Sequence, residues 1–194
     1  LIPAGGGCKE LLLRWDDILT ATYPKIPPQY RWSRRINGGP MAVVQKAFEN
    51  IAFAKVSMSA KEAKKMGFLR SIDDITLSRD HLLQDAKNDV LTMAKDFQPE
   101  VPREDILLPG AGGLSALKSA IRGFLALKQV SEHDAVIAEK LGYILTGGDV
   151  AVQHMTTEQH LLDLEREAFL SLVGMEKTQA RMQHMLMSGK PLRN

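Results

Sequence analysis

Two clusters of glycine precede apolar stretches of helical periodicity. The first reads Ile-Pro-Ala-Gly-Gly-Gly over residues 2–7, and the second reads Pro-Gly-Ala-Gly-Gly over residues 109–113. Backbone N–H groups at the start of a helix bind anions, so each cluster is a candidate phosphate or oxyanion site. The first lacks the Lys-Ser/Thr pair of a P-loop, and the second has Ser115 where GxGxxG needs its third glycine. We interpret the second cluster as a structural helix start and the first as backbone that needs unusual geometry or close approach.

Side chains that could do acid–base, nucleophilic or metal chemistry are few and scattered. The five histidines lack the i,i+4 spacing of a helical zinc site, and the single Cys8 has no histidine near it in sequence. We therefore expect no dedicated metal site, and we expect Cys8 to be a small buried residue rather than a nucleophile. Asp16, Asp17, Glu165 and Glu167 fall on expected helices, where we expect solvated carboxylates.

The last expected helix carries charge on one side and methionine on the other. Lys177, Arg181 and His184 recur at i, i+4 and i+7, followed by Lys190 and Arg193, and this basic edge could meet phosphates. The opposite side carries Met175, Met182, Met185 and Leu186. Such a face is typical of a core or of a helix–helix contact, so we expect it to be buried against another element or subunit.

Composition is that of an ordinary soluble globular protein. Of the 194 residues, 44% are hydrophobic and 25% are charged, and the formal net charge is only +2. This balance favours neither nucleic acid nor an anionic membrane as a partner. A single Cys, no membrane-length apolar run and no signal peptide lead us to expect a cytoplasmic protein. Since the chain does not begin with Met, we expect it to be cut from a longer one.

Apolar residues recur at three- and four-residue steps along most of the chain, which predicts about eight helices and an all-α fold with little or no sheet. Ser59, Ser131 and Thr156 are the expected caps of three helices, and the helix after the second glycine cluster is expected to begin near Leu114. A long amphipathic helix is expected over residues 78–97, and a brief strand over 67–72. Residues 24–40 contain four of the nine prolines and predict a loop or a lid.

The order of several motifs resembles the crotonase (enoyl-CoA hydratase/isomerase) family. Residues 2–7 match its proline and glycine turn, and Ser59–Leu69 matches the small-Ala-x-x-Ala-x-x-x-Gly-hydrophobic stretch that follows. Residues 161–169 and 189–191 resemble the C-terminal trimerisation helices of that family. The tail from Phe169 to Asn194 is similar to that of bacterial multifunctional β-oxidation proteins, in which a 3-hydroxyacyl-CoA dehydrogenase comes first and a crotonase-like module last.

The resemblance implies a division of the chain and a substrate. Residues 1–97 would be a crotonase-like segment, and residues 98–194 a C-terminal helical region with an insertion at about 129–155. The substrate would be an acyl-CoA thioester. Both family glutamates that position and deprotonate water would lie upstream of residue 1, so no catalytic residue is expected here. We expect the backbone of Ala4, Gly5 and Gly6 to contact the substrate and Lys190 to contact CoA.

The resemblance also implies what this chain leaves to others. NAD would be needed only by the dehydrogenase part, and no cofactor is expected in this chain itself. The expected partners are the remainder of the parent chain and further copies of this one, joined through the C-terminal helices. By itself the chain is expected to be inactive. The alternative that we keep open is a free-standing helical interaction module that docks through its methionine-rich last helix.

Overall fold

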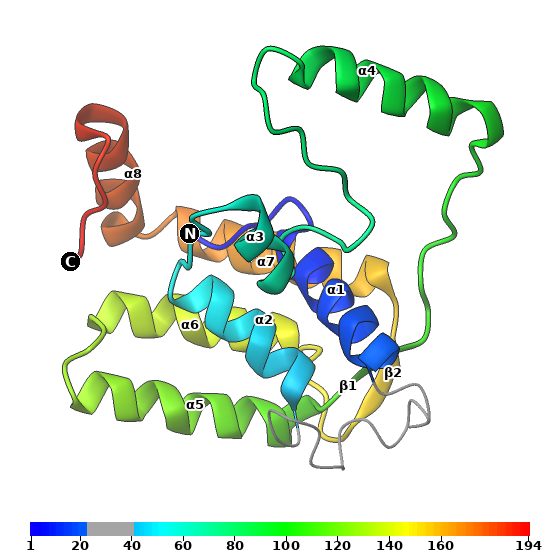
Figure 1. The fold of residues 1–194 in the computed structure, drawn as a ribbon. Coiled ribbons are helices and arrows are strands. Elements are labelled where there is room, and N and C mark those ends of the chain that lie inside the picture. The colour runs from blue at the N-terminus through cyan, green and yellow to red at the C-terminus, as the bar shows by residue number, and fades with distance from the viewer. Residues whose placement is uncertain (23–40) are drawn as a thin grey trace. The chain divides into compact units, whose positions relative to one another are not determined.

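A computed structural model describes residues 1–22 and 41–194 (Figure 1). The loop or lid expected at 24–40 lies outside these residues. The described chain forms two compact units, one of Leu1–Val56 with Arg103–Asn194 and one of Ser57–Pro102. These units are defined by which residues pack together. The predicted boundary at residue 97 was instead based on the order of sequence motifs, and it stays a prediction.

The first unit contains six described α-helices and one small antiparallel sheet. Its elements are α1 (Gly7–Thr22), α2 (Ala42–Ala52), β1 (Ile106–Leu108), α5 (Gly110–Ala126), α6 (Glu132–Leu145), β2 (His154–Thr156), α7 (Glu158–Val173) and α8 (Glu176–Ser188). In the sheet Ile106 pairs with Thr156 and Leu108 with His154. The fold is therefore predominantly helical, which confirms the predicted class.

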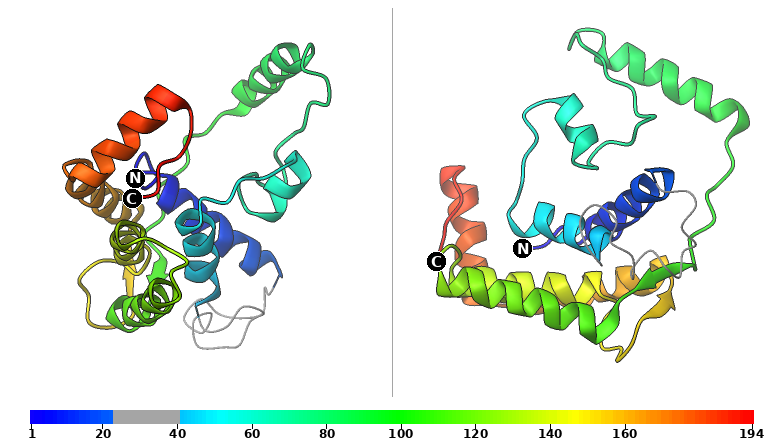
Figure 2. Two further views of the ribbon diagram at one scale, coloured as in Figure 1. Left: turned by 90° about the vertical axis from the view of Figure 1, so that its left-hand side faces the viewer. Right: turned by 60° about the horizontal axis from the view of Figure 1, so that its bottom comes forward.

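Helix α6 is the centre of the first unit. It packs against α5, α2, α7 and α1, and Figure 2 shows α5 and α6 running alongside one another. The large aliphatic side chains that are fully buried come from these elements and from β1; they are Leu12, Val44, Leu108, Leu141, Ile144, Leu145, Leu161 and Leu172. Burial of such side chains is the main driving force for docking amphipathic helices. Helix α1 is thereby held between α2, α6 and α7.

The second glycine cluster is a structural helix start, as the sequence predicted, but α5 begins four residues earlier than expected. Gly110 has φ +64°, and a Cβ there would lie 2.5 Å from the Val152 carbonyl oxygen. Its N–H donates to Thr146, and the Ala111 N–H donates to Val150. The segment after α6 thus lies directly against Gly110, and its backbone carbonyls accept hydrogen bonds from the first two N–H groups of α5. No anion is needed to satisfy these two donors.

Local side-chain caps define two other helix starts. Ser131 caps α6 as expected, and the Asp134 side chain makes the cap reciprocal by accepting from the Ser131 N–H. Helix α7 is capped by Thr157, whose hydroxyl accepts from the His160 N–H, and not by Thr156. Thr156 belongs to β2, where it pairs with Ile106, so the sheet shifts the cap by one residue.

The second unit contains α3 (Ala60–Lys65), α4 (Leu82–Met93) and a 3₁₀ turn, η2 (Ala94–Asp96). Ser59 caps α3 as expected. The expected strand at 67–72 does not form, because turns occupy this stretch and the Arg70 N–H donates to the Asp73 carboxylate. Helix α4 is shorter than the expected 78–97, and none of its residues is buried. The apolar stripe that predicted an amphipathic helix is exposed; it includes Leu82, Leu83, Val90 and Phe97.

Candidate functional site

The proline and glycine turn at the start of the chain folds back into α1. The Gly7 N–H donates to the Pro3 carbonyl at 3.1 Å. Gly6 has φ +91°, and a Cβ on Gly7 would come within 2.7 Å of the Pro3 Cβ. Backbone geometry therefore favours glycine at position 6, and the close approach of the Pro3 ring favours it at position 7. Gly5 is different, because its φ is not positive and a Cβ there would meet nothing within 4 Å.

Glu165 of α7 supplies the anion at the start of α1. Its carboxylate accepts from the Gly6 N–H at 2.9 Å and from the Lys9 N–H at 2.6 Å. The side chain is completely buried, so the expectation of a solvated carboxylate was wrong. A helix N-terminus favours negative charge, and here the chain provides that charge itself.

The sequence did contain a signal for this residue. Leu161, Glu165, Ala168 and Leu172 recur at i, i+4, i+7 and i+11, which is the buried face of α7. A charged residue inside an apolar stripe must find hydrogen-bond partners when it is buried. The interruption was visible in the sequence, whereas the partners, more than 150 residues away, were not.

Burial raises the pKa of Glu165, while the Lys9 and Gly6 N–H groups and the Lys9 charge oppose that rise. The carboxylate has no exposed surface and both of its oxygens already accept a backbone N–H. A general base needs access to the proton it removes. Glu165 is therefore arranged to hold backbone rather than to do acid–base chemistry.

Cys8 is buried beside the same carboxylate. Burial and the negative charge of Glu165 both raise the pKa of the Cys8 thiol. A thiolate is the nucleophilic form, so this environment suppresses reactivity. The structure thus confirms the sequence interpretation of Cys8 as a small buried residue.

Lys9 ties the start of α1 to the start of α7. Its ammonium lies 2.6 Å from Glu10 and 2.7 Å from Glu158. The second oxygen of Glu158 accepts the Arg103 N–H at 2.8 Å. Burial alone would raise the pKa of Glu158, but its bonds to Lys9 and Arg103 hold the pKa below the ordinary value. The network ties the first turn of α1 to the start of α7 and to the backbone at Arg103.

Ala4, Gly5 and Lys190 are the residues that the sequence predicted to contact the substrate or CoA and that have not yet been located. Ala4 is half-buried and Gly5 is exposed, next to one another on the turn, whereas the Gly6 N–H is already used by Glu165. Lys190 lies beyond the end of α8, is exposed, and forms no ion pair with the described residues. Among the described residues no contact joins Lys190 to the turn, so the roles of Ala4, Gly5 and Lys190 stay predictions.

One residue of the basic edge of α8, Arg181, is engaged within the chain. Arg181 forms an ion pair with Asp134 at 2.6 Å, and the hydroxyl of Thr178 lies 2.9 Å from the ring of the buried His133. The methionine-rich side of the same helix is exposed in this chain, contrary to burial against another element of it; Met182, Met185, Leu186 and Met187 are all exposed. Burial against a second subunit is untested.

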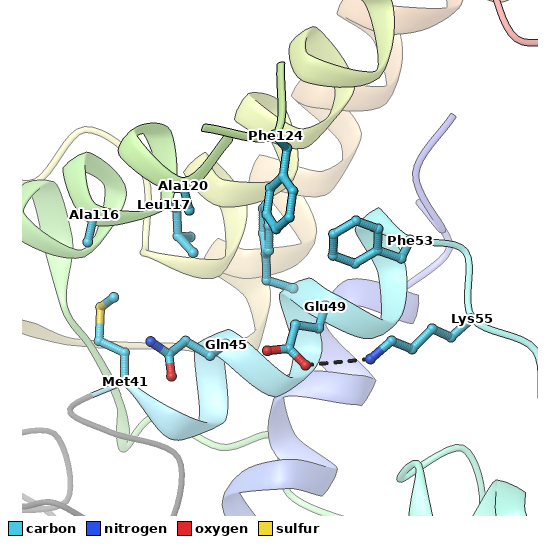
Figure 3. Close-up of a pocket in the computed structure, with 10 residues that line it drawn as sticks. Met41, Gln45, Glu49, Phe53, Lys55, Ala116, Leu117, Ala120 and Phe124 are labelled. Carbon is cyan, nitrogen blue, oxygen red and sulfur yellow. Dashed lines mark hydrogen bonds and ion pairs between the residues drawn. The ribbon is translucent and has the colours of Figure 1, made fainter. Parts of the chain in front are cut away.

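A cavity of about 430 Å³ lies between α2 and α5 and was not foreseen from the sequence. Figure 3 shows Phe53 and Phe124 near one another beside it, with ring centroids 5.3 Å apart and planes at 82°. Lys55 and Glu49 are paired at 3.5 Å at the same cavity. The remaining lining is mostly apolar and includes Met41, Phe48, Ala116 and Leu117. The cavity can hold an apolar group, but it carries no unpaired buried acid, base or nucleophile among the described residues.

Within residues 1–22 and 41–194, no three His, Cys, Asp or Glu side chains are grouped so that they could hold a metal ion. Among the helices that the structure describes, none has the length and apolar character needed to cross a membrane.

Comparison with known proteins gives one informative relative. The chain is 43% identical over 195 aligned residues to a protein of Bacillus subtilis (strain 168) named probable 3-hydroxyacyl-CoA dehydrogenase. The alignment covers 100% of this chain but 22% of that protein, so the chain spans about a fifth of its relative's length. No protein-family model matches. No solved structure matches either.

Proposed function

We propose that this chain is a segment of a 3-hydroxyacyl-CoA dehydrogenase-type enzyme of fatty-acid β-oxidation, in which it shapes part of an acyl-CoA thioester site. The observation that carries the proposal is the 43% identity over the whole chain to a protein of that name. Such identity over the whole chain supports the same fold and a corresponding place in a longer parent protein.

The finer part of the proposal is a crotonase-like role for the opening turn. Gly6 is favoured by its positive φ and Gly7 by the close approach of the Pro3 ring, but neither reason applies to Gly5. Its exposed position and the open space above it suit the close approach of another molecule. In a crotonase-like site that molecule is the thioester, and the Ala4 and Gly5 backbone would line it. Lys190 would serve the CoA end.

The reaction itself is assigned to residues outside this chain. Hydration of an enoyl thioester needs donors for the oxyanion and acids that activate water. The Gly6 N–H and Glu165 are committed to one another, and Cys8 is protonated and buried. The described residues therefore contribute shape and backbone, and the segment alone is inactive.

NAD does not fit the glycine clusters of this chain. The first amides of α5, at Gly110 and Ala111, donate to Thr146 and Val150, and the start of α1 already holds Glu165. These amides are therefore not free to bind a pyrophosphate. Under this proposal NAD serves the dehydrogenase part of the longer protein.

The test uses crotonyl-CoA with the 194-residue chain and with the longer protein that contains it. We expect no hydration by the chain alone. In the longer protein, Gly5→Val fills the open space without strain and should lower kcat/KM for hydration by at least about tenfold, or 1.4 kcal/mol of transition-state stabilisation. Gly112→Val, at the other open glycine near a helix start, is the matched control. Turnover by the chain alone, or an unaffected Gly5→Val protein, contradicts the proposal.

A second candidate function rests on the exposed methionines of α8. Met185 and Met187 are 46% and 83% exposed on a helix whose only buried residue is Thr178. An exposed methionine face suits a partner helix, including that of a second copy. Light scattering tests this: an interaction module associates with a partner or with itself, and Met185→Gln with Met187→Gln abolishes the association.

A further inference from the structure

We propose that Glu165 is the positioning residue of the acyl-CoA site, acting through the backbone of the opening turn. The inference rests on the proposed function and deepens it. Glu165 reaches from α7 to the first turn of α1 and holds the amides of Gly6 and Lys9 at 2.9 and 2.6 Å. The bond to Gly6 fixes the Gly5–Gly6 peptide plane directly after Gly5, and the bond to Lys9 fixes the first turn of α1 that follows it.

The arrangement replaces a local helix cap. Most helices begin with Ser, Thr, Asp or Asn, whose own side chain accepts the first amides. In α1 the capping position is Gly6, which has no side chain and sits at φ +91°. Instead, the carboxylate of Glu165 on α7 accepts hydrogen bonds from the Gly6 and Lys9 N–H groups. The consequence is a capped helix whose capping residue places no side-chain atoms on the turn.

An apolar residue would suit the packing of α7 better than a carboxylate. Position 165 lies on the buried stripe formed by Leu161, Ala168 and Leu172. Burying a carboxylate is costly even when it is hydrogen-bonded, and replacement of buried charge by apolar side chains often stabilises a protein. Packing alone therefore does not account for glutamate at this position, whereas holding two amides does.

The groups around Glu165 leave the backbone amides of α1 as its direct partners. The ionisable groups that face it are Cys8 and Lys9 of α1. The Lys9 ammonium is already shared between Glu10 and Glu158, so it is not the direct partner of Glu165. The backbone amides are the partners that a substitution of Glu165 would release.

The test compares Glu165→Gln with Glu167→Gln, an exposed glutamate on the same helix. In the 194-residue chain, ¹⁵N NMR follows the Gly6 and Lys9 amide signals over pH 4–8. With Glu165 present we expect both signals to titrate together, with a midpoint above the ordinary value for glutamate. Glu165→Gln should abolish that titration and shift both signals, and Glu167→Gln should change neither.

The second readout is hydration of crotonyl-CoA by the longer protein. Glu165→Gln should lower kcat by about 10- to 100-fold, as is typical when a supporting residue behind a site is lost, with a smaller change in KM. If Glu165→Gln does not fold, Glu165→Asp keeps the charge but draws it back by one methylene, and the same losses are expected in part.

The outcomes separate the two proposals. Shifted amide signals with unchanged kcat overturn the positioning role and leave the proposed function intact. Unchanged amide signals overturn it as well. No hydration by the unsubstituted longer protein overturns the proposed function, and the positioning role with it.

Discussion

The ring Nε2 of His133 lies 2.9 Å from the hydroxyl of Thr178, and both side chains are buried. The contact joins α6 to α8 across 45 positions of sequence. Thr178 is the only buried residue of α8 in the described structure. Together with the Arg181–Asp134 ion pair at 2.6 Å, this hydrogen bond attaches α8 to the central helix mainly through polar contacts.

Thr178→Val tests that attachment, because valine keeps the shape of threonine and removes the hydroxyl. The His133 ring then has a buried nitrogen without a partner, and the free energy of unfolding should fall by about 1–3 kcal/mol. Urea unfolding at constant m measures the loss. Thr178→Ser keeps the hydroxyl and should recover the hydrogen bond. Equal stability of the valine and threonine proteins would contradict the role assigned to this contact.

His133 also makes stability depend on pH. Burial, the positive charges of Arg181 and Lys177 and the chain's amino group lower the pKa of His133 below 6.5 in the folded state. Below pH 6.5 the unfolded chain therefore binds a proton that the folded chain resists, so stability falls as the pH drops from 6.5 through the lowered pKa.

The contribution of His133 to the pH dependence of the unfolding free energy is measured by comparing the original protein with the His133→Gln variant, whose side chain does not titrate. The raised pKa of Glu165 acts in the opposite direction, because the folded state then binds protons more readily and stability falls as the pH rises above 4.5. Both proteins share that contribution. We expect the difference in unfolding free energy between them to vary between pH 5 and 7, and a constant difference would refute the assignment.

Alanine substitutions at two glycines of α5, Gly110 and Gly112, are expected to have opposite effects on stability. Gly110→Ala forces a side chain into φ +64° and within 2.5 Å of the Val152 carbonyl oxygen, so it should lower the free energy of unfolding by more than about 1 kcal/mol. Gly112→Ala meets nothing within 4 Å and should stabilise the helix by up to about 1 kcal/mol. Thermal unfolding followed by circular dichroism compares them. Similar melting temperatures for the two variants would show that the segment after α6 moves easily.

Helix periodicity explains why most elements were predictable. Leu11 and Leu12 in α1, or Leu161 and Leu172 in α7, recur at steps that put them on one face, and these faces form the core. The same rule failed for α4, whose apolar residues are exposed. Periodicity reports that a helix has an apolar side, but it does not report what covers that side.

Helix boundaries followed local chemistry only where no other element intervened. Ser59 and Ser131 cap the helices that the sequence assigned to them. Thr156 does not cap α7, because it pairs with Ile106 in the sheet. Helix α5 starts at Gly110, because backbone carbonyls about forty residues downstream accept hydrogen bonds from its first N–H groups. These shifts depend on contacts between distant segments.

The amino-acid sequence alone determined the helical class, the burial of Cys8 and the structural nature of the second glycine cluster. The resemblance of its tail to proteins that carry a 3-hydroxyacyl-CoA dehydrogenase agrees with the relative's name, whereas the crotonase-like motif order stays a prediction. Tertiary structure alone decided that the anion at the opening glycines is Glu165. The reason is physical. Backbone dihedrals and helix periods are set by neighbours within a few residues, whereas the partner of a buried charge is set by whichever helix the core brings beside it.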